Sequence, residues 1–244
     1  MRTVSTIALL WRHERPLPPR PGRPPTITVD RIVDAGIAEA DAEGLSGLSL
    51  RGVAQRLGVG TMTLYGHVEG RAQLLELMVD QCRRRMAFRP PTGDPRRMLE
   101  QVAAENRTLL AQHPWLAAVE TERAVLGPGT LGKYERELAA VEPLPLSDVD
   151  KDQALALVLG FVAYSARAAA SARAERAQEP PDQWWRREGA ELAKLGVAER
   201  FPLGDRIGSA VGAASGAAAG ADAAYVFGLA VILDGVESRA MRAE

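Results

Sequence analysis

Five residues between positions 61 and 67 carry side chains suited to contacts with nucleic acid. Thr61, Met62, Thr63, Tyr65 and His67 combine small or planar polar groups with one apolar side chain. A helix face that meets only water would instead carry Glu and Lys. Bases in the major groove of DNA offer hydrogen-bonding edges and thymine methyl groups, and phosphates line its rim. The pattern therefore favours a surface that reads DNA.

The spacing of Ala54, Gly58 and Leu64 would place these residues on the second helix of a helix-turn-helix. Ala54 is small enough for two helices to approach closely, and Gly58 can adopt the positive φ of a tight turn. Leu64 would anchor the second helix in the core. Many helical hairpins share this spacing, so a purely structural hairpin is the alternative on this evidence.

Other chemistry is not indicated by the sequence. The three His and one Cys are too scattered for a recognisable metal site. The chain has no motif of a catalytic serine, a phosphate-binding glycine loop or a catalytic Cys–His pair. His113, just before Pro114, is expected to cap or pack a helix. Cys82 allows no internal disulfide, which suits a cytoplasmic protein. We therefore expect no enzyme activity, no metal and no cofactor.

Helices separated by Pro and Gly are expected throughout, because no stretch shows the alternation of a strand. In the N-terminal part, Thr28 and Ser49 can cap helices that end at Gly44 and Gly58. A short helix over 61–67 and another from about 70 to 85 follow. Residues 204–221, rich in Gly, Ala and Ser, are expected to be a mobile loop. The remaining helices are predicted over 95–112, 114–126, 130–141, 147–178, 182–195 and 222–242.

The length of 244 residues is enough for an all-α protein of two domains. The composition predicts a disordered, basic, Pro/Arg-rich arm over 1–25, which could follow DNA phosphates or be a solvated tail. A three-helix helix-turn-helix domain over 26–88 and a larger ligand-binding and dimerisation domain over 89–244 would follow. No apolar stretch reaches the roughly 20 residues that cross a bilayer, so no membrane partner is expected.

The segments LSLRGVAQRLGVGTMTLYGHVEGRAQLLELMVD and IVDAGIAEADAEG resemble the DNA-binding domain of TetR-family transcriptional regulators. The resemblance covers residues 28–80. Residues 227–237, FGLAVILDGVE, are similar to the last dimerisation helix in the branch that contains the tetracycline repressor. The resemblance implies a homodimeric repressor that binds double-stranded operator DNA and leaves it when a small-molecule effector binds.

The resemblance also assigns individual DNA contacts. Arg51 would reach a base, guanine by preference, through its forked donors, a contact worth about 1–3 kcal/mol of discrimination. Thr61 and Met62 would face base edges. Gly66 replaces a bulky Trp of that branch, so a different operator is expected. The phosphate contacts would come from Thr63, Tyr65, His67 and Arg71.

For the effector, the resemblance implies a site between helices of the C-terminal domain. The alternative for each wall residue is that it simply packs the core. The His and Asn that bind magnesium–tetracycline in that branch are not matched, so a metal–tetracycline ligand is not expected. The site walls would be Val102, Asn106, Leu109, Glu120, Tyr134, Phe161 and Tyr164, with Trp184 of the partner subunit.

A single short recognition helix touches few bases, so two-fold symmetry and a palindromic operator with half-sites about 34–36 Å apart, or a multiple of that, are expected. The apolar faces of 147–178 and 222–242 would form an intersubunit four-helix bundle. Three alternatives are open: a ligand-dependent activator or corepressor-type regulator, a helical small-molecule-binding protein or enzyme without DNA function, and a protein-interaction module.

Overall fold

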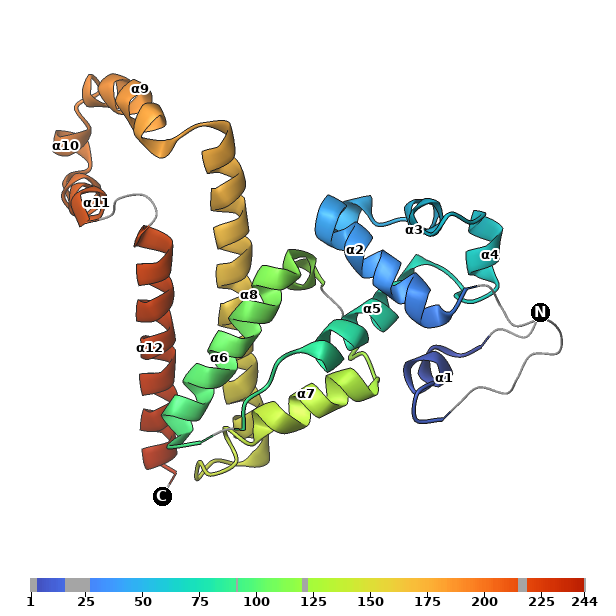
Figure 1. The fold of residues 1–244 in the computed structure, drawn as a ribbon. Coiled ribbons are helices and arrows are strands. Elements are labelled where there is room, and N and C mark those ends of the chain that lie inside the picture. The colour runs from blue at the N-terminus through green and yellow to red at the C-terminus, as the bar shows by residue number, and fades with distance from the viewer. Residues whose placement is uncertain (1–3, 16–26, 91, 120–122, 215–218, 244) are drawn as a thin grey trace.

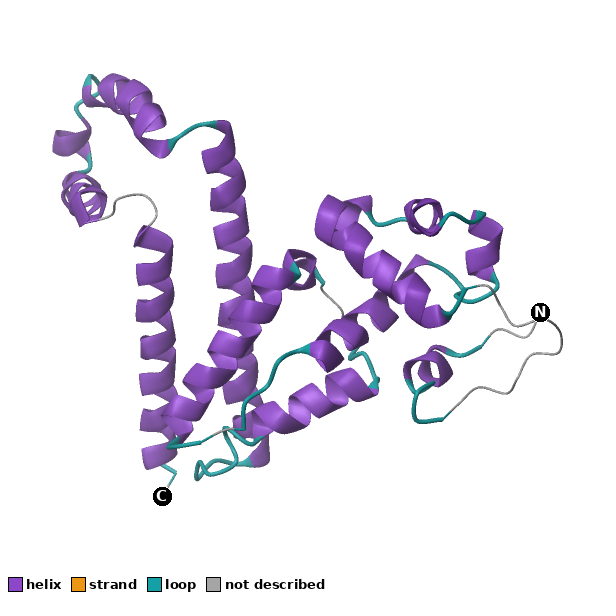
Figure 2. Ribbon diagram, viewed as in Figure 1, coloured by secondary structure: helices purple, strands orange, loops and turns teal. Residues whose placement is uncertain are grey.

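The computed structural model describes residues 4–15, 27–90, 92–119, 123–214 and 219–243, and these residues form helices and loops without a strand (Figure 1, Figure 2). The expected all-α fold class is confirmed. In chain order the helices are α1 (Thr6–Leu10), α2 (Val29–Gly47), α3 (Leu50–Leu57), α4 (Thr61–Tyr65), α5 (Arg71–Arg85), α6 (Pro95–Gln112), the 3₁₀ helix η1 (Pro114–Ala118), α7 (Pro128–Leu138), α8 (Asp148–Gln178), α9 (Pro181–Ala193), α10 (Val197–Arg200), α11 (Pro202–Ala214) and α12 (Ala219–Met241).

Capping side chains begin α2 and α3 at the residues that the sequence predicts. The hydroxyl oxygens of Thr28 and Ser49 accept hydrogen bonds from the backbone N–H three residues on, at 3.3 and 3.0 Å. Gly58 ends α3 with a φ of 68°, a conformation that costs glycine little. At Gly44, with a φ of 71°, the backbone leaves helical geometry, and α2 then resumes for three residues.

Residues 4–15 differ from the disordered arm expected over 1–25. They contain α1, whose N-terminus is capped by Ser5 and whose Leu9 and Leu10 are buried in the N-terminal core. Burial of two leucines offsets the entropy that ordering the segment costs. The Pro/Arg-rich remainder of the expected arm, like residues 1–3, lies outside the described residues.

One hydrophobic core joins α2 to α5 and continues beyond the expected domain boundary after residue 88. Leu64 of α4 is fully buried in it. The same core also takes in Leu109 of α6, Trp115 of η1 and Val125, which all lie in the C-terminal part of the sequence. The DNA-binding region and the region that follows it are therefore packed against each other.

A second core lies between α6, α8 and α12. It includes Val158 and Val162 of α8 and Leu233 of α12, and Figure 1 shows α8 and α12 running side by side. Ser147 caps α8 as predicted, through a hydrogen bond of 3.1 Å from the N–H of Asp150. Helices α9 to α11 connect the far ends of α8 and α12 and bury none of their described residues.

Two segments fold differently from the sequence expectation. The helix expected over 114–126 is a 3₁₀ helix that ends at Ala118, where Arg167 of α8 donates a 2.6 Å hydrogen bond to the carbonyl of Ala117 and so satisfies it outside an α-helix. The loop expected over 204–221 is helical up to Ala214 and again from 219. Alanine, the strongest helix former, outweighs the glycines there.

Candidate functional site

The hairpin of α3 and α4 is held rigidly by its turn. The N–H groups of Gly58 and Val59 donate to the carbonyls of Gln55 and Ala54 at 3.1 and 3.0 Å. Ala54 is almost fully buried, and the fully buried Leu64 fixes α4 on the core. The outward face of α4 therefore has one orientation relative to α2 and α5.

That outward face carries large side chains without a packing role in the chain. Met62 is 80% exposed, Tyr65 is 46% exposed, and Thr63 is exposed as well. Thr61 and His67 are half-buried. A methionine so exposed on a five-residue helix contributes nothing to the core, which makes it available to a partner.

Three arginines of the hairpin region have different surroundings. Arg51 is exposed at the start of α3 and, within the described part of the chain, makes no hydrogen bond or ion pair. Arg56 instead forms an ion pair of 3.0 Å with Glu39 of α2. Arg71 donates to the carbonyl of Leu48 at 3.0 Å and to that of Leu45 at 2.6 Å. Arg51 is thus the arginine of this group with all its donors available.

The described residues that were predicted to form the effector site fall into a buried group and a group that is half-buried or exposed. Val102 belongs to the second core and Leu109 to the N-terminal core. The buried amide of Asn106 donates to the carbonyl of Val102 at 2.9 Å and to the carboxylate of Glu137. Glu120 lies outside the described residues. The buried members therefore hold the helices together in this chain.

Glu137 connects this group to a buried polar network between α5, α6 and α7. Its second oxygen accepts from the ammonium of Lys133 at 2.7 Å. Burial lowers the pKa of Lys133, and it lowers that of Arg83 on α5 too, while the charge of Glu137 opposes both shifts. The sequence reasoning missed this network. Its signal was the Lys and Glu four residues apart on a helix with few apolar residues.

The other members lie on three different helices, and among them Phe161 is half-buried against the second core. Tyr134 of α7 donates to Asp152 at 2.7 Å, and this hydrogen bond raises the pKa of the tyrosine. Phe161 stacks on Tyr225 of α12 with 5.8 Å between ring centroids. Tyr164 of α8 and Trp184 of α9 are both exposed, at 63% and 42%. The cavities found between described residues do not bring these groups together.

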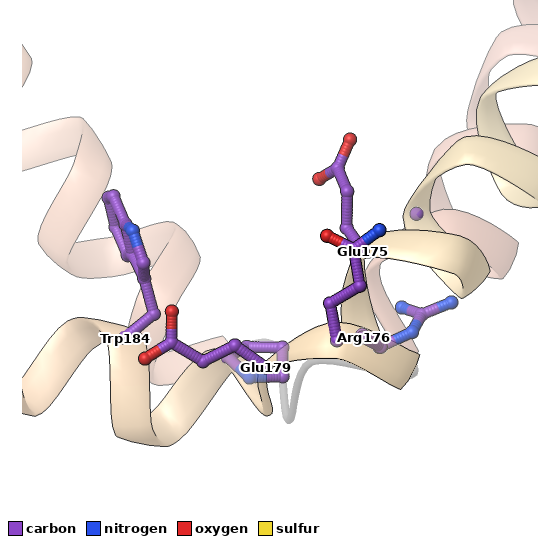
Figure 3. Close-up of a pocket in the computed structure, with 7 residues that line it drawn as sticks. Glu175, Arg176, Glu179 and Trp184 are labelled. Atoms are coloured by element: carbon purple, nitrogen blue, oxygen red, sulfur yellow. The ribbon is translucent and has the colours of Figure 1, made fainter.

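Two cavities are lined mainly by residues that the sequence analysis did not select. One of about 170 Å³ lies between α6, α8 and α12, where Arg107 sits 4.4 Å over the ring of Tyr225 and pairs with Asp222. An open one of about 440 Å³ lies at the junction of α8 and α9. Figure 3 shows Glu175 and Arg176 at the end of α8 on one side of it and Trp184 on the other. Of the predicted ligand residues, Trp184 lines this cavity, and Leu109 lines another of about 140 Å³ together with Phe88 and Gln112.

Comparison with known proteins identifies the family. The tetracycline repressor-like C-terminal domain matches residues 89–240. The HTH-type transcriptional repressor DrrR1 of Streptomyces coeruleorubidus is 38% identical over 238 residues, which cover 96% of this chain and 85% of that protein. The chain belongs to the TetR family of transcriptional regulators.

Solved structures of TetR-family proteins have the same fold. Apo ActR from Streptomyces coelicolor superposes with a TM-score of 0.72 at 26% identity, over 91% of this chain and 100% of that one. ActR in complex with actinorhodin gives a TM-score of 0.69 at 27% identity, over 90% and 99%. The expectation of a ligand-responsive, DNA-binding transcriptional repressor is confirmed by these relatives. The individual DNA and ligand contacts stay predictions.

Proposed function

We propose that this TetR-family protein acts as a homodimer that binds a palindromic operator through α4 and the start of α3, and that a small molecule bound in the C-terminal region releases it. The observation that carries the proposal is the exposed face of α4, together with an exposed Arg51 at the start of α3 that makes no hydrogen bond or ion pair with the described residues. Base edges would meet Arg51, Thr61 and Met62. Phosphates would meet Thr63, Tyr65 and His67. Arg71 would add those guanidinium donors that do not bond the carbonyls of Leu45 and Leu48.

Exposed apolar side chains on α8 and α12 support the homodimer. By length and composition α8 could also cross a membrane. However, one side of α8 packs in the second core, where α8 contacts α12, and both helices carry further apolar side chains that are exposed. A second copy would cover both helices at once, as in a four-helix bundle. The exposed residues are Val149, Leu157, Tyr164, Val226, Phe227, Val231 and Met241.

Helices α9 to α11 support a contribution of one subunit to the effector site of the other. They carry exposed apolar side chains but bury none of their described residues in their own chain. In the dimer, Trp184 of the partner subunit would complete a site that Asn106, Phe161 and their neighbours begin. ActR has been solved with actinorhodin and with (S)-DNPA, so actinorhodin is the first probe to use.

The test is selection of bound duplexes from a random DNA pool, carried out with wild-type protein, Arg51→Ala and Arg97→Ala. Arg97 is an exposed arginine of α6, 76% accessible, and provides the same change of charge away from the hairpin. We expect wild type and Arg97→Ala to enrich the same palindrome and Arg51→Ala to lose it, since each guanine contact is worth about 1–3 kcal/mol.

The same palindrome then tests the response to effector. Actinorhodin should raise the operator Kd of the wild type, and enrichment that occurs only with actinorhodin would indicate a corepressor-type regulator. Equal enrichment by wild type and Arg51→Ala would contradict the assigned DNA surface. Binding that does not weaken with salt would contradict phosphate contacts altogether. A function on DNA also implies a cytoplasmic location.

A further inference from the structure

The N-terminal segment 4–15 is anchored on the last helix of the DNA-binding region. Gln73 of α5 is buried, and its amide nitrogen donates to the carbonyl of Val4 at 3.3 Å and to the hydroxyl of Thr6 at 3.1 Å. Leu9 and Leu10 pack into the N-terminal core beside it. Polar and apolar contacts together therefore fix α1 on α5.

The end of the same segment is anchored on the first turn of α2. Arg12, just after α1, is largely buried, donates to the carbonyl of Leu9 in α1 at 2.7 Å, and forms an ion pair with Asp30. His13 lies 3.0 Å from the same carboxylate oxygen. Burial would raise the pKa of Asp30, but the hydrogen bond and charge of Arg12 outweigh it and hold that pKa below its usual value.

The third anchor lies in the C-terminal region. The indole N–H of Trp11 donates to the carbonyl of Leu126 at 2.9 Å, across 115 positions of sequence. Leu126 precedes the start of α7, where Gly127 approaches the side chain of Asp80 so closely that a Cβ would lie 2.2 Å from its Oδ1. The segment 123–127 is thus held at two points, by the hydrogen bond from Trp11 to Leu126 and by the close approach of Gly127 to Asp80 of α5.

We propose that residues 4–15 form a strap that couples movement of segment 123–127 to α2 and α5, with Trp11 as the positioning residue that holds the C-terminal end. Movement of this segment away from α5 must break the Trp11–Leu126 hydrogen bond. Movement of α2 relative to α5 must strain the anchors at Asp30 and Gln73. Since α3 and α4 are packed on α2 and α5, operator binding and the position of segment 123–127 become linked, and such linkage is reciprocal.

Trp11→Phe tests the strap, because it keeps an aromatic ring and removes the indole donor. Trp185→Phe is the control, since Trp185 is exposed on α9, far from α1. In the free full-length protein, hydrogen exchange of peptides covering 4–15 and 123–130 should become about 2- to 13-fold faster in Trp11→Phe, the equivalent of one neutral hydrogen bond. It should be unchanged in Trp185→Phe. If peptides covering 123–130 exchanged at the wild-type rate in Trp11→Phe, the proposal would be overturned.

The linkage itself is tested with the selected operator duplex, an arm that rests on the proposed function. Operator should slow exchange of 123–130 in the wild type and Trp185→Phe, and this effect should vanish in Trp11→Phe while α4 stays protected. Asp30→Asn weakens the opposite anchor and should also abolish the slowing of exchange of 123–130 by operator. Equal protection of 123–130 by operator in all four proteins would overturn the coupling. Failure of the wild type to bind operator would overturn the function on DNA, whereas the free-protein result would still decide whether the strap exists.

Discussion

Replacing Glu137 by Gln should destabilise the protein far more than the same change at the surface. The Glu137 side chain is only 5% exposed and accepts hydrogen bonds from Lys133 and Asn106. Burial already works against the charge of Lys133, as the lowered pKa of that group indicates. Without the Glu137 carboxylate, a cation remains buried between α5, α6 and α7 with its principal counter-charge removed.

Breaking a buried pair by removing one partner costs about 3–5 kcal/mol. For a domain of this size, a loss of 1 kcal/mol lowers Tm by roughly 2–4 °C, so a fall of about 6–20 °C is expected. Glu142→Gln is the matched control, because Glu142 pairs with Lys151 over 2.8 Å but its side chain is 75% exposed. A surface pair of this kind contributes at most about 1 kcal/mol.

The measurement is denaturant unfolding of wild type, Glu137→Gln and Glu142→Gln under identical conditions. The double variant Lys133→Met with Glu137→Gln separates lost charge pairing from lost packing, since it removes the buried cation and keeps an acceptor for Asn106. It should recover most of the stability that the single variant loses. A Glu137→Gln protein within 1 kcal/mol of wild type, or a double variant as unstable as the single, would refute this reasoning.

Three further predictions concern close packing. Gly129→Ala should cost about 1–3 kcal/mol of unfolding free energy, because the added Cβ would lie 2.1 Å from the carbonyl oxygen of Asp80. Gly132→Ala should be neutral or stabilising, because its Cβ would meet no described atom closer than 3.5 Å, and equal effects of the two variants would contradict the close approach. Leu64→Ala should cost about 2–5 kcal/mol and weaken operator binding in an anisotropy titration, and unchanged stability would exclude Leu64 as the anchor of α4. Cys82 should react with a thiol reagent at pH 8 only after denaturation, because burial and then the charge of Asp41 raise its pKa to about 12; rapid native-state reaction would contradict this.

Sequence reasoning succeeded where the signal is local. Thr28, Ser49 and Ser147 are hydroxyl residues directly before apolar helical repeats, and each caps a helix. Gly58 ends α3 because few other residues tolerate its φ of 68°. These features depend on the nearest four or five residues, so the chain reveals them without its tertiary structure.

Sequence reasoning failed where the partner is far away in the chain. Residues 4–11 carry an apolar run too short to interpret alone, and Leu9 and Leu10 become buried where α1 packs on α5 in the N-terminal core. The hydrogen bond of Asn106 to Glu137, 31 positions away, could not be predicted from the sequence, and its role as a ligand residue stays a prediction. The glycines in 204–214 predicted a loop, but the high helix propensity of the neighbouring alanines supports a helix there.

The hydrophobic core of the DNA-binding region extends across the expected domain boundary after residue 88. Leu109, Trp115 and Val125 belong to the same core as the DNA-binding helices. Asp41 of α2 accepts hydrogen bonds from the Trp115 indole at 2.8 Å and from His113, and Asp80 of α5 accepts one from the N–H of Thr130 at 2.8 Å. Allosteric coupling of 1–3 kcal/mol is typical, which is the net worth of two or three such hydrogen bonds. An effector therefore has no hinge to close between independent bodies. It must rearrange contacts within one shared core, and the two regions should unfold together in a single cooperative transition.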